Sequence, residues 1–210
     1  MTMQQLNLLA AVSLAACWGA FALAWLAGAI YYESQAPEER TRAWFGSAMP
    51  IGGVIVAAVA IAVPKAEWHS LAVHTPWLRI LGLAILLAAT AFTIWARVAL
   101  GTMWSAAPTV KQQHKLRTSG PYGVTRHPIY TGMLGMMLGS ALLAGGRWIL
   151  PFPIFLVLLE IKIHVEERLM LAEFPDDYPH YRQRVPELVP GLRLVSRRRV
   201  PSGQADVSIH

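Results

Sequence analysis

The chain has 210 residues, of which 55% are hydrophobic and only 14% are charged. Soluble domains carry roughly 25% charged residues, so this composition excludes an ordinary soluble domain and indicates a polytopic membrane protein. The single cysteine, Cys17, excludes a disulfide framework and a Cys/His zinc site. The net charge of +6 comes from basic residues that flank apolar segments, a distribution that fits membrane topology rather than nucleic-acid binding.

Five apolar segments follow one another along the chain, at residues 6–30, 43–64, 77–100, 127–146 and 148–159. The first is uncharged and about 37 Å long as a helix, which suffices to cross about 30 Å of hydrocarbon. A cleaved signal peptide is the alternative for this segment, but the apolar run is too long and residues 1–7 lack Lys and Arg. We therefore expect an all-α fold with about five transmembrane helices.

Two features inside these segments predict how the helices lie. Arg79 and Arg97 stand near the ends of the third segment, where they are expected to snorkel towards water. Gly135 and Gly139 form a GxxxG pattern in the fourth segment, which predicts close helix packing.

The basic residues predict the orientation in the membrane. Most Lys and Arg residues lie in the loops at 31–46 and 101–127 and in the chain after residue 160. The positive-inside rule places these parts in the cytoplasm and the N-terminus outside, and we expect the membrane to be the bacterial inner membrane. We divide the chain into three N-terminal helices (1–100), a core with two helices (101–195) and a basic, then polar, disordered tail (196–210).

The fifth segment stays apolar for too short a distance to cross a bilayer. Its twelve uncharged residues rise only about 18 Å, yet the helical pattern continues to about Ala172. Ionisable residues at this depth are costly and usually functional. Lys162 and Glu166 share one helix face, and Glu160, His164 and Glu167 share another. The alternative is a surface ion pair worth about 0.3–0.5 kcal/mol, and no metal is expected, because three ligands on one straight helix cannot surround an ion.

The segment before the fourth helix combines turn residues with polar side chains. Residues 120–123 read Gly-Pro-Tyr-Gly, a turn sequence, and Pro128 fits the first position of a helix. Arg126, His127 and Tyr130 then lie at a helix N-terminus, which favours an anionic group such as a ligand carboxylate. The alternatives are a packed or capping histidine and tyrosines of the interfacial belt.

These motifs occur in an order that resembles the isoprenylcysteine carboxyl methyltransferases and the related bacterial phospholipid methyltransferases. The resemblance covers about residues 95–191. The matching residues are Leu100-Gly101, Trp104-Ser105, Leu116, Ser119-Gly120-Pro121-Tyr122, Arg126-His127-Pro128-Ile129-Tyr130, Gly132, Glu166-Glu167, Leu169, Phe174 to Tyr178, Tyr181, Arg184-Val185-Pro186 and Pro190.

The resemblance implies S-adenosylmethionine as cofactor, held on the cytosolic side by the 101–127 loop and the last two helices. The implied cofactor-binding residues are Lys111, His114, Lys115, Leu116, Arg117, Tyr122, His127, Pro128, Ile129, Tyr130, Glu166 and Glu167. Glu166 would bind the ammonium or ribose. Lys162 stands where better-known eukaryotic members have a substrate-contacting arginine, and lysine lacks the planar two-point grip of that residue.

The predicted function is methyl transfer to a lipid-like or small amphipathic acceptor, either a carboxylate such as isoprenylcysteine or an amine or thiol. Methyl transfer needs alignment and charge placement rather than a metal or a covalent nucleophile. Either Arg126 or Lys162 would position the acceptor's headgroup, while its apolar tail enters from membrane lipid. Two alternatives remain open. One is an NADPH-dependent sterol-type reductase, although that family tends to have Asn at position 129. The other is a non-catalytic lipid- or partner-binding membrane protein.

Overall fold

The computed structural model describes residues 3–33, 39–42, 75–103, 109–111, 116–145 and 151–191. Its elements are α1 (Met3–Glu33), β1 (Glu39–Arg42), α4 (Pro76–Leu100), η2 (Gly101–Met103) and β2 (Thr109–Lys111), followed by α5 (Pro121–Val124), α6 (Pro128–Ala144), α7 (Pro151–Glu173) and α8 (Asp177–Arg184). The predicted second segment (43–64), the tail (196–210), His114 and Lys115 lie outside the described residues.

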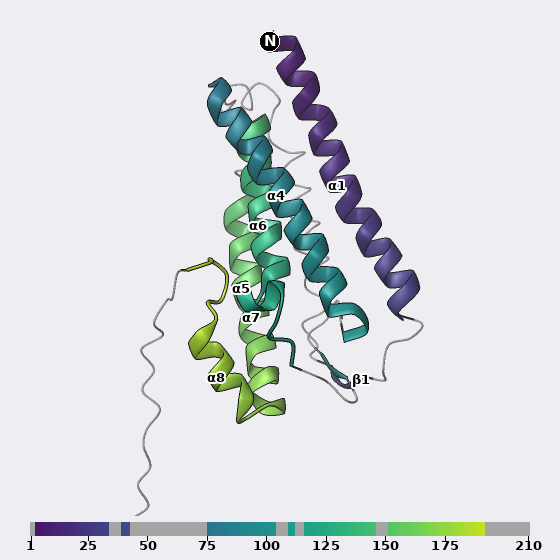
Figure 1. Ribbon diagram of the computed structural model, residues 1–210, viewed down its shortest axis with the longest axis vertical. Helices are drawn as coiled ribbons and strands as arrows, with labels where there is room; N and C mark the ends of the chain where they lie inside the picture. Colours follow the sequence, from purple (N-terminus) through teal and green to yellow (C-terminus); the bar gives the residue numbers. More distant parts are fainter. Residues whose placement is uncertain are drawn as a thin grey trace, which may run out of the picture.

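Helices dominate the described residues, as predicted, and their long axes run roughly together (Figure 1). Four predicted apolar segments correspond to α1, α4, α6 and α7. The helical pattern predicted beyond the fifth apolar run is confirmed, because α7 continues to Glu173. Within the described ranges, Gln4–Tyr31 and Pro76–Met103 are long and apolar enough to cross a membrane, and α6 is a shorter apolar helix. The sequence did not predict the antiparallel pairing of β1 with β2.

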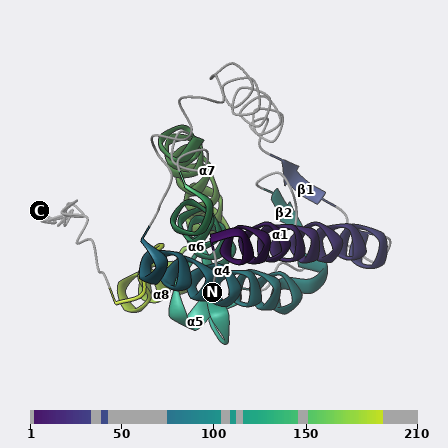
Figure 2. The ribbon, with the colours of Figure 1, turned by 90° about the horizontal axis from the view of Figure 1, so that it is seen from above.

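Helices α4 and α6 form the tightest pair, and α1 packs against both of them, mainly against α4 (Figure 2). Glycines make the α4–α6 approach possible. A Cβ on Gly139 would lie 2.6 Å from the backbone nitrogen of Leu86 and 2.8 Å from the carbonyl oxygen of Gly82. A Cβ on Gly135 would lie 2.8 Å from that of Ala89. The packing role predicted for the GxxxG pattern is confirmed.

Gly139→Ala is expected to destabilise the protein by about 1–3 kcal/mol, because the new methyl group overlaps the backbone of α4 and the helices must separate. Thermal unfolding in detergent measures the effect. Gly19→Ala is the matched control, since a Cβ at Gly19 meets no atom within 4 Å. Equal melting temperatures for the two variants would contradict the prediction.

The two arginines of α4 do not snorkel. Arg79 is 5% exposed and Arg97 is 2% exposed. The Nε of Arg79 donates to the carbonyl oxygen of Leu143 at 3.1 Å, and its Nη2 donates to that of Leu6 at 3.1 Å. Arg79 thus joins α1, α4 and α6 at one end of the bundle. The snorkelling prediction was wrong because neighbouring backbone carbonyls, rather than water, are the nearest acceptors.

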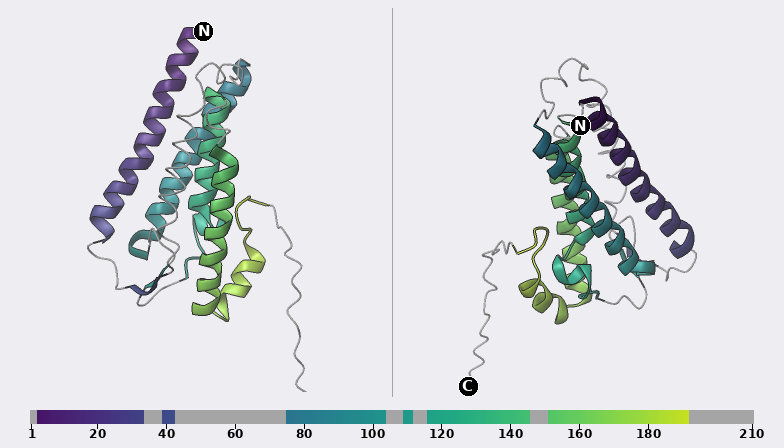
Figure 3. Two further views of the ribbon diagram at one scale, coloured as in Figure 1. Left: turned by 180° about the vertical axis from the view of Figure 1, so that it is seen from behind. Right: turned by 45° about the horizontal axis from the view of Figure 1, so that its top comes forward.

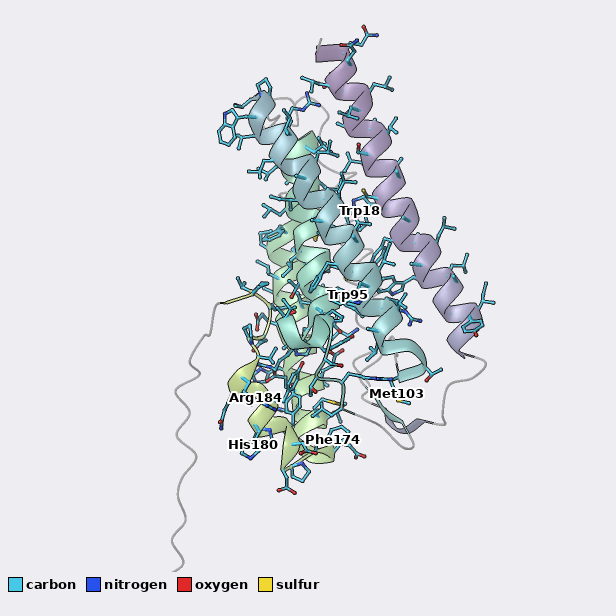
Figure 4. All side chains as sticks on the ribbon, in the orientation of Figure 1. Trp18, Trp95, Met103, Phe174, His180 and Arg184 are labelled. Carbon is cyan, nitrogen blue, oxygen red and sulfur yellow. The ribbon has the colours of Figure 1, made fainter. Side chains whose placement is uncertain are left out.

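Helix α8 folds back beside the C-terminal half of α7, at the end of the molecule away from the start of α1 (Figure 3). Phe174, His180 and Arg184 mark this end, and Met103 lies at the same end (Figure 4). The short helix α5, the start of α6 and the charged part of α7 meet there.

Candidate active site

The acidic pair of α7 faces His127 at the start of α6. The distance from His127 Nδ1 to Glu166 Oε2 is 3.5 Å, and the distance from His127 Nε2 to Glu167 Oε1 is 3.7 Å. The helix begins at this point because Pro128 has no N–H to lose and His127 is held away from helical geometry, with φ −121° and ψ 63°. The sequence-predicted histidine and both carboxylates therefore form one cluster.

Glu166 is the more accessible of the two carboxylates, with a side chain 23% exposed against 10% for Glu167. The hydroxyl of Tyr130 donates to Glu166 Oε1 at 2.5 Å. The Nζ of Lys162 lies 3.9 Å from the same oxygen and 5.5 Å from the centre of the Tyr130 ring. Lys162 itself is only 6% exposed. A buried lysine, a tyrosine and a half-buried carboxylate therefore share one polar site.

Glu167 forms ion pairs with two arginines. The Nε of Arg126 donates to Glu167 Oε1 at 2.7 Å, and Nη2 lies 2.7 Å from the same oxygen. Arg182 reaches the other oxygen of Glu167 at 3.4 Å. Arg126 also pairs with Glu187 at 3.1 Å and donates to the carbonyl oxygen of Val185 at 2.7 Å. Every guanidinium nitrogen of Arg126 thus has a partner within the protein.

The segment 182–188, which comprises the end of α8 and the residues after it and which we call the strap, closes over the start of α6. The amides of Arg126 and His127 donate to the carbonyl oxygens of Pro186 and Glu187 at 2.8 and 3.1 Å. The hydroxyl of Thr131 donates to the carbonyl oxygen of Leu188 at 2.6 Å. No role in the site was predicted for these residues, although Arg184 to Pro186 were among the matched motifs. The amides immediately before α6 are therefore occupied by the strap.

The other predicted site residues lie around this cluster at different distances from it. Tyr122, in α5, is half-buried, and its carbonyl oxygen accepts a hydrogen bond from Tyr181 at 2.6 Å. Pro128 and Ile129 are buried in the first turn of α6. Leu116 is half-buried and Arg117 is exposed, so their side chains have different surroundings. The backbone of Lys111 belongs to β2, which contacts α7.

The two carboxylates favour the charged form of His127. Burial opposes protonation of the imidazole, but Glu166 and Glu167 more than offset it and raise the pKa of His127 from 6.5 to about 9. His127 precedes α6, and its ring stacks on that of Tyr130 with the planes 10° apart. The imidazolium thus separates two carboxylates that would otherwise repel each other.

The raised pKa of His127 predicts that stability falls as the pH rises. A folded-state pKa above the unfolded value of 6.5 gives a stabilising contribution that is complete below pH 6.5 and is lost as the pH passes through about 9. Melting temperatures measured from pH 6 to 10 should therefore decline. His127→Gln lacks this contribution and should show a smaller decline over the same interval. Parallel curves for the two proteins would contradict the prediction.

Comparison with known proteins finds similarity to methyltransferases. The phospholipid methyltransferase family matches residues 77–177. Methanethiol S-methyltransferase 2 of Bradyrhizobium diazoefficiens is 36% identical over 83 residues, which are 40% of this chain and 31% of that protein. Protein-S-isoprenylcysteine O-methyltransferase of Schizosaccharomyces pombe is 34% identical over 82 residues, or 38% and 34% of the two chains. The matched part thus spans about a third of the length of these relatives.

A solved structure shares the fold. The eukaryotic intramembrane Ras methyltransferase, an isoprenylcysteine carboxyl methyltransferase, superposes with a TM-score of 0.50 and 23% identity over 56% of this chain and 43% of its own. The ordered motifs predicted this relationship. Residues 77–177 of the chain are therefore related to the phospholipid methyltransferase family, and the chain resembles the membrane methyltransferases of the isoprenylcysteine carboxyl methyltransferase type.

Proposed function

We propose that the protein is an integral membrane S-adenosylmethionine-dependent methyltransferase that acts on a lipid-like or small amphipathic acceptor. The observation that carries the proposal is the position of Glu166. Its carboxylate is half-buried, fixed by Tyr130 and His127, and lies where α6 and α7 meet. Since Glu167 is already paired with Arg126 and Arg182, Glu166 is the carboxylate with capacity to meet a cationic ligand.

The donor set fits this cofactor. When bound, S-adenosylmethionine supplies a methyl group on a positively charged sulfur and also carries an ammonium group. A carboxylate held by protein hydrogen bonds favours such a charge without having to reorganise. Glu166 is proposed to hold the ammonium or ribose, with the aromatic rings of Tyr122 and Tyr130 beside it. The 111–117 segment is proposed to hold the adenine, with Lys111, His114, Lys115, Leu116 and Arg117 as its contributors.

Lys162 is proposed to position the acceptor. Arg126 is proposed to hold the helices that form the site in place. All nitrogens of Arg126 contact Glu167, Glu187 or strap carbonyls, so the residue fixes the start of α6 against α7. The Nζ of Lys162 lies beside Glu166 and Tyr130, nearer the apolar half of α7. An ammonium there favours an acceptor with a carboxylate or thiolate nucleophile.

Lys162→Gln is expected to raise the KM for the acceptor by about tenfold or more, because a charge-assisted contact contributes about 1.5–3 kcal/mol. The affinity for S-adenosylhomocysteine should change little. Initial rates at varied acceptor concentration, together with calorimetry for the nucleotide, separate the two effects. Lys162→Arg keeps the charge and is the control. A loss of nucleotide affinity with unchanged acceptor KM would contradict this assignment.

The membrane arrangement is part of the proposal. The start of α1 and helix α8 lie at opposite ends of the molecule (Figure 1), which fits placing them on opposite sides of a membrane. From the positive-inside rule we propose that the N-terminus is outside and the C-terminus is in the cytoplasm, with a bacterial inner membrane as the membrane. Four of the five proposed spans correspond to α1, α4, α6 and α7. The remaining proposed span is the second in chain order, the segment 43–64. The proposed units are 1–100, 101–195 and the tail 196–210.

Calorimetry on the purified protein in detergent tests the proposed function, with S-adenosylhomocysteine and NADPH as alternative ligands. We expect binding of the former only. Radiolabelled methyl transfer from S-adenosylmethionine into a total lipid and small-metabolite extract then identifies the acceptor. Oxidation of NADPH would overturn the proposal in favour of a reductase. Absence of both binding and transfer would overturn it in favour of a non-catalytic protein.

A further inference from the structure

Helix α5 is a single helical turn, and one of its carbonyl groups is bonded from a distant helix. The turn ends with a bond from the amide of Thr125 to the carbonyl oxygen of Pro121 at 3.2 Å. The last carbonyl groups of a helix have no partner inside the helix, so the carbonyl oxygen of Tyr122 needs another donor. The hydroxyl of Tyr181 in α8 donates to this oxygen at 2.6 Å, across 59 residues of sequence.

The donor of this bond is buried. Tyr181 is 3% exposed, and its ring lies 5.8 Å, centre to centre, from that of Tyr178, which is 2% exposed. Helices α5 and α8 lie next to each other when the molecule is seen from above (Figure 2). Removal of the Tyr181 hydroxyl would therefore leave the carbonyl oxygen of Tyr122 without its donor at a place where water is a poor replacement.

Helix α8 also holds the chain that follows α5. The Nη1 of Arg126 donates to the carbonyl oxygens of Arg182 and Val185 at 3.3 and 2.7 Å. The stretch from Tyr122 to Arg126 is thus fixed from α8 at both ends. The two ends differ in what they serve, because Arg126 belongs to the ion pairs described above, whereas Tyr181 reaches a residue assigned to the cofactor.

We propose that Tyr181 is a positioning residue for Tyr122, and that α8 contributes to nucleotide binding through α5. By holding the backbone of Tyr122, the Tyr181 hydroxyl fixes the direction in which the Tyr122 side chain leaves α5. The inference rests on the proposed function, since that function places the ring of Tyr122 beside the ligand. Nucleotide binding and the docking of α8 on α5 then stabilise each other, because coupling between two binding events is reciprocal.

The first test removes one hydroxyl group. Tyr181→Phe keeps the buried ring and should raise the dissociation constant for S-adenosylhomocysteine about three- to tenfold, the loss expected for one hydrogen bond. The KM for S-adenosylmethionine should rise by a similar factor, with a largely retained kcat. Calorimetry and initial rates measure the two effects. Unchanged affinity in Tyr181→Phe would overturn the inference, whereas a wild type that does not bind the nucleotide would overturn the proposed function instead.

Tyr178→Phe is the matched control, because it removes a second buried hydroxyl from the same helix. Burial raises the pKa of the Tyr178 phenol and the charge of Glu167 raises it further, so this hydroxyl lies near the carboxylate that pairs with Arg126. The control variant should lower the melting temperature but bind the nucleotide as the wild type does. Equal losses of affinity in the two variants would show that any loosening of α8 has this effect, which would overturn the assignment to Tyr181.

A double-mutant cycle tests whether Tyr181 acts through Tyr122. Tyr122→Leu removes the ring but keeps the carbonyl group that Tyr181 binds. If Tyr181 positions this ring, adding Tyr181→Phe to Tyr122→Leu should cause no further loss of affinity. Additive losses would overturn the inference.

Hydrogen exchange in the wild-type protein tests the inference without any substitution. S-adenosylhomocysteine should slow the exchange of amides at the end of α8, such as that of Val185, which donates to the carbonyl oxygen of Tyr181 at 3.0 Å. Helix α1 is the internal reference, and its exchange should stay the same. Tyr181→Phe should lose most of the protection in α8. Exchange in wild-type α8 that does not respond to the nucleotide would overturn the inference.

Discussion

Replacing Glu166 with Gln is expected to weaken S-adenosylmethionine binding by roughly 10- to 100-fold. A charge-assisted hydrogen bond contributes about 1.5–3 kcal/mol, and Gln removes the charge while it keeps the size of the side chain. The amide oxygen can still accept the hydrogen bond from Tyr130, so the fold should be retained. Calorimetric titration with S-adenosylmethionine and S-adenosylhomocysteine measures the loss. It should be larger for the former, whose sulfonium carries the additional positive charge.

The matched control for Glu166 is Glu160 on the same helix. Glu160 is exposed and lies with Ile161 and His164 along a shallow hollow on another face of α7. Glu160→Gln removes an equal charge less than two helical turns away and should leave the nucleotide affinity unchanged. A Glu166→Gln variant that binds as tightly as the wild type would remove the basis of the proposed cofactor site. Equal losses in both variants would indicate a general electrostatic effect rather than a contact.

The sequence predicted the positions of helices better than their partners. Apolar length and proline position were enough to place α4 and α6 within one or two residues of their observed bounds. The extension of α7 followed from its helical pattern, although its apolar run ended at Leu159. These properties are local, because they depend on neighbours within a few turns along the chain.

Contacts between residues far apart in the chain could not be predicted as well from the sequence. Glu166 and Glu167 are neighbours on one helix, so the sequence shows that their side chains point in different directions. It does not show that Arg126 pairs with Glu167 or that Tyr130 donates a hydrogen bond to Glu166. These partners are separated by 41 and 36 residues. The contacts of the strap could not be predicted for the same reason. The strap accepts most of its hydrogen bonds through backbone carbonyl oxygens, and these do not depend on which side chains the strap carries. The resemblance brought Arg126 and Glu167 into one motif set, whereas the structure shows that the guanidinium of Arg126 is engaged by Glu167, Glu187 and backbone carbonyl oxygens.

Arg126→Ala is expected to destabilise the protein by about 3–5 kcal/mol, the usual cost of removing one partner from a buried ion pair. The side chains of Arg126 and Glu167 are 7% and 10% exposed, so water cannot replace the guanidinium at the carboxylate. The strap also loses its contacts between Arg126 and both Glu187 and the Val185 carbonyl oxygen. Thermal or denaturant unfolding in detergent measures the change, and proteolysis within 182–188 should become faster.

Arg182→Ala provides the comparison that separates burial from charge. Arg182 approaches the same carboxylate at 3.4 Å, but its side chain is 37% exposed. Exposed pairs contribute about 0–1 kcal/mol, so this variant should unfold close to the wild type although it also removes one positive charge. Adding Glu167→Gln to Arg126→Ala should recover part of the lost stability, since the uncompensated buried charge is then gone. If the two arginine variants were equally stable, Arg126 would not be the residue that holds α6, α7 and the strap together. The ion pair with Arg126 would then not explain why Glu167 has a structural role and Glu166 is proposed to bind the ligand.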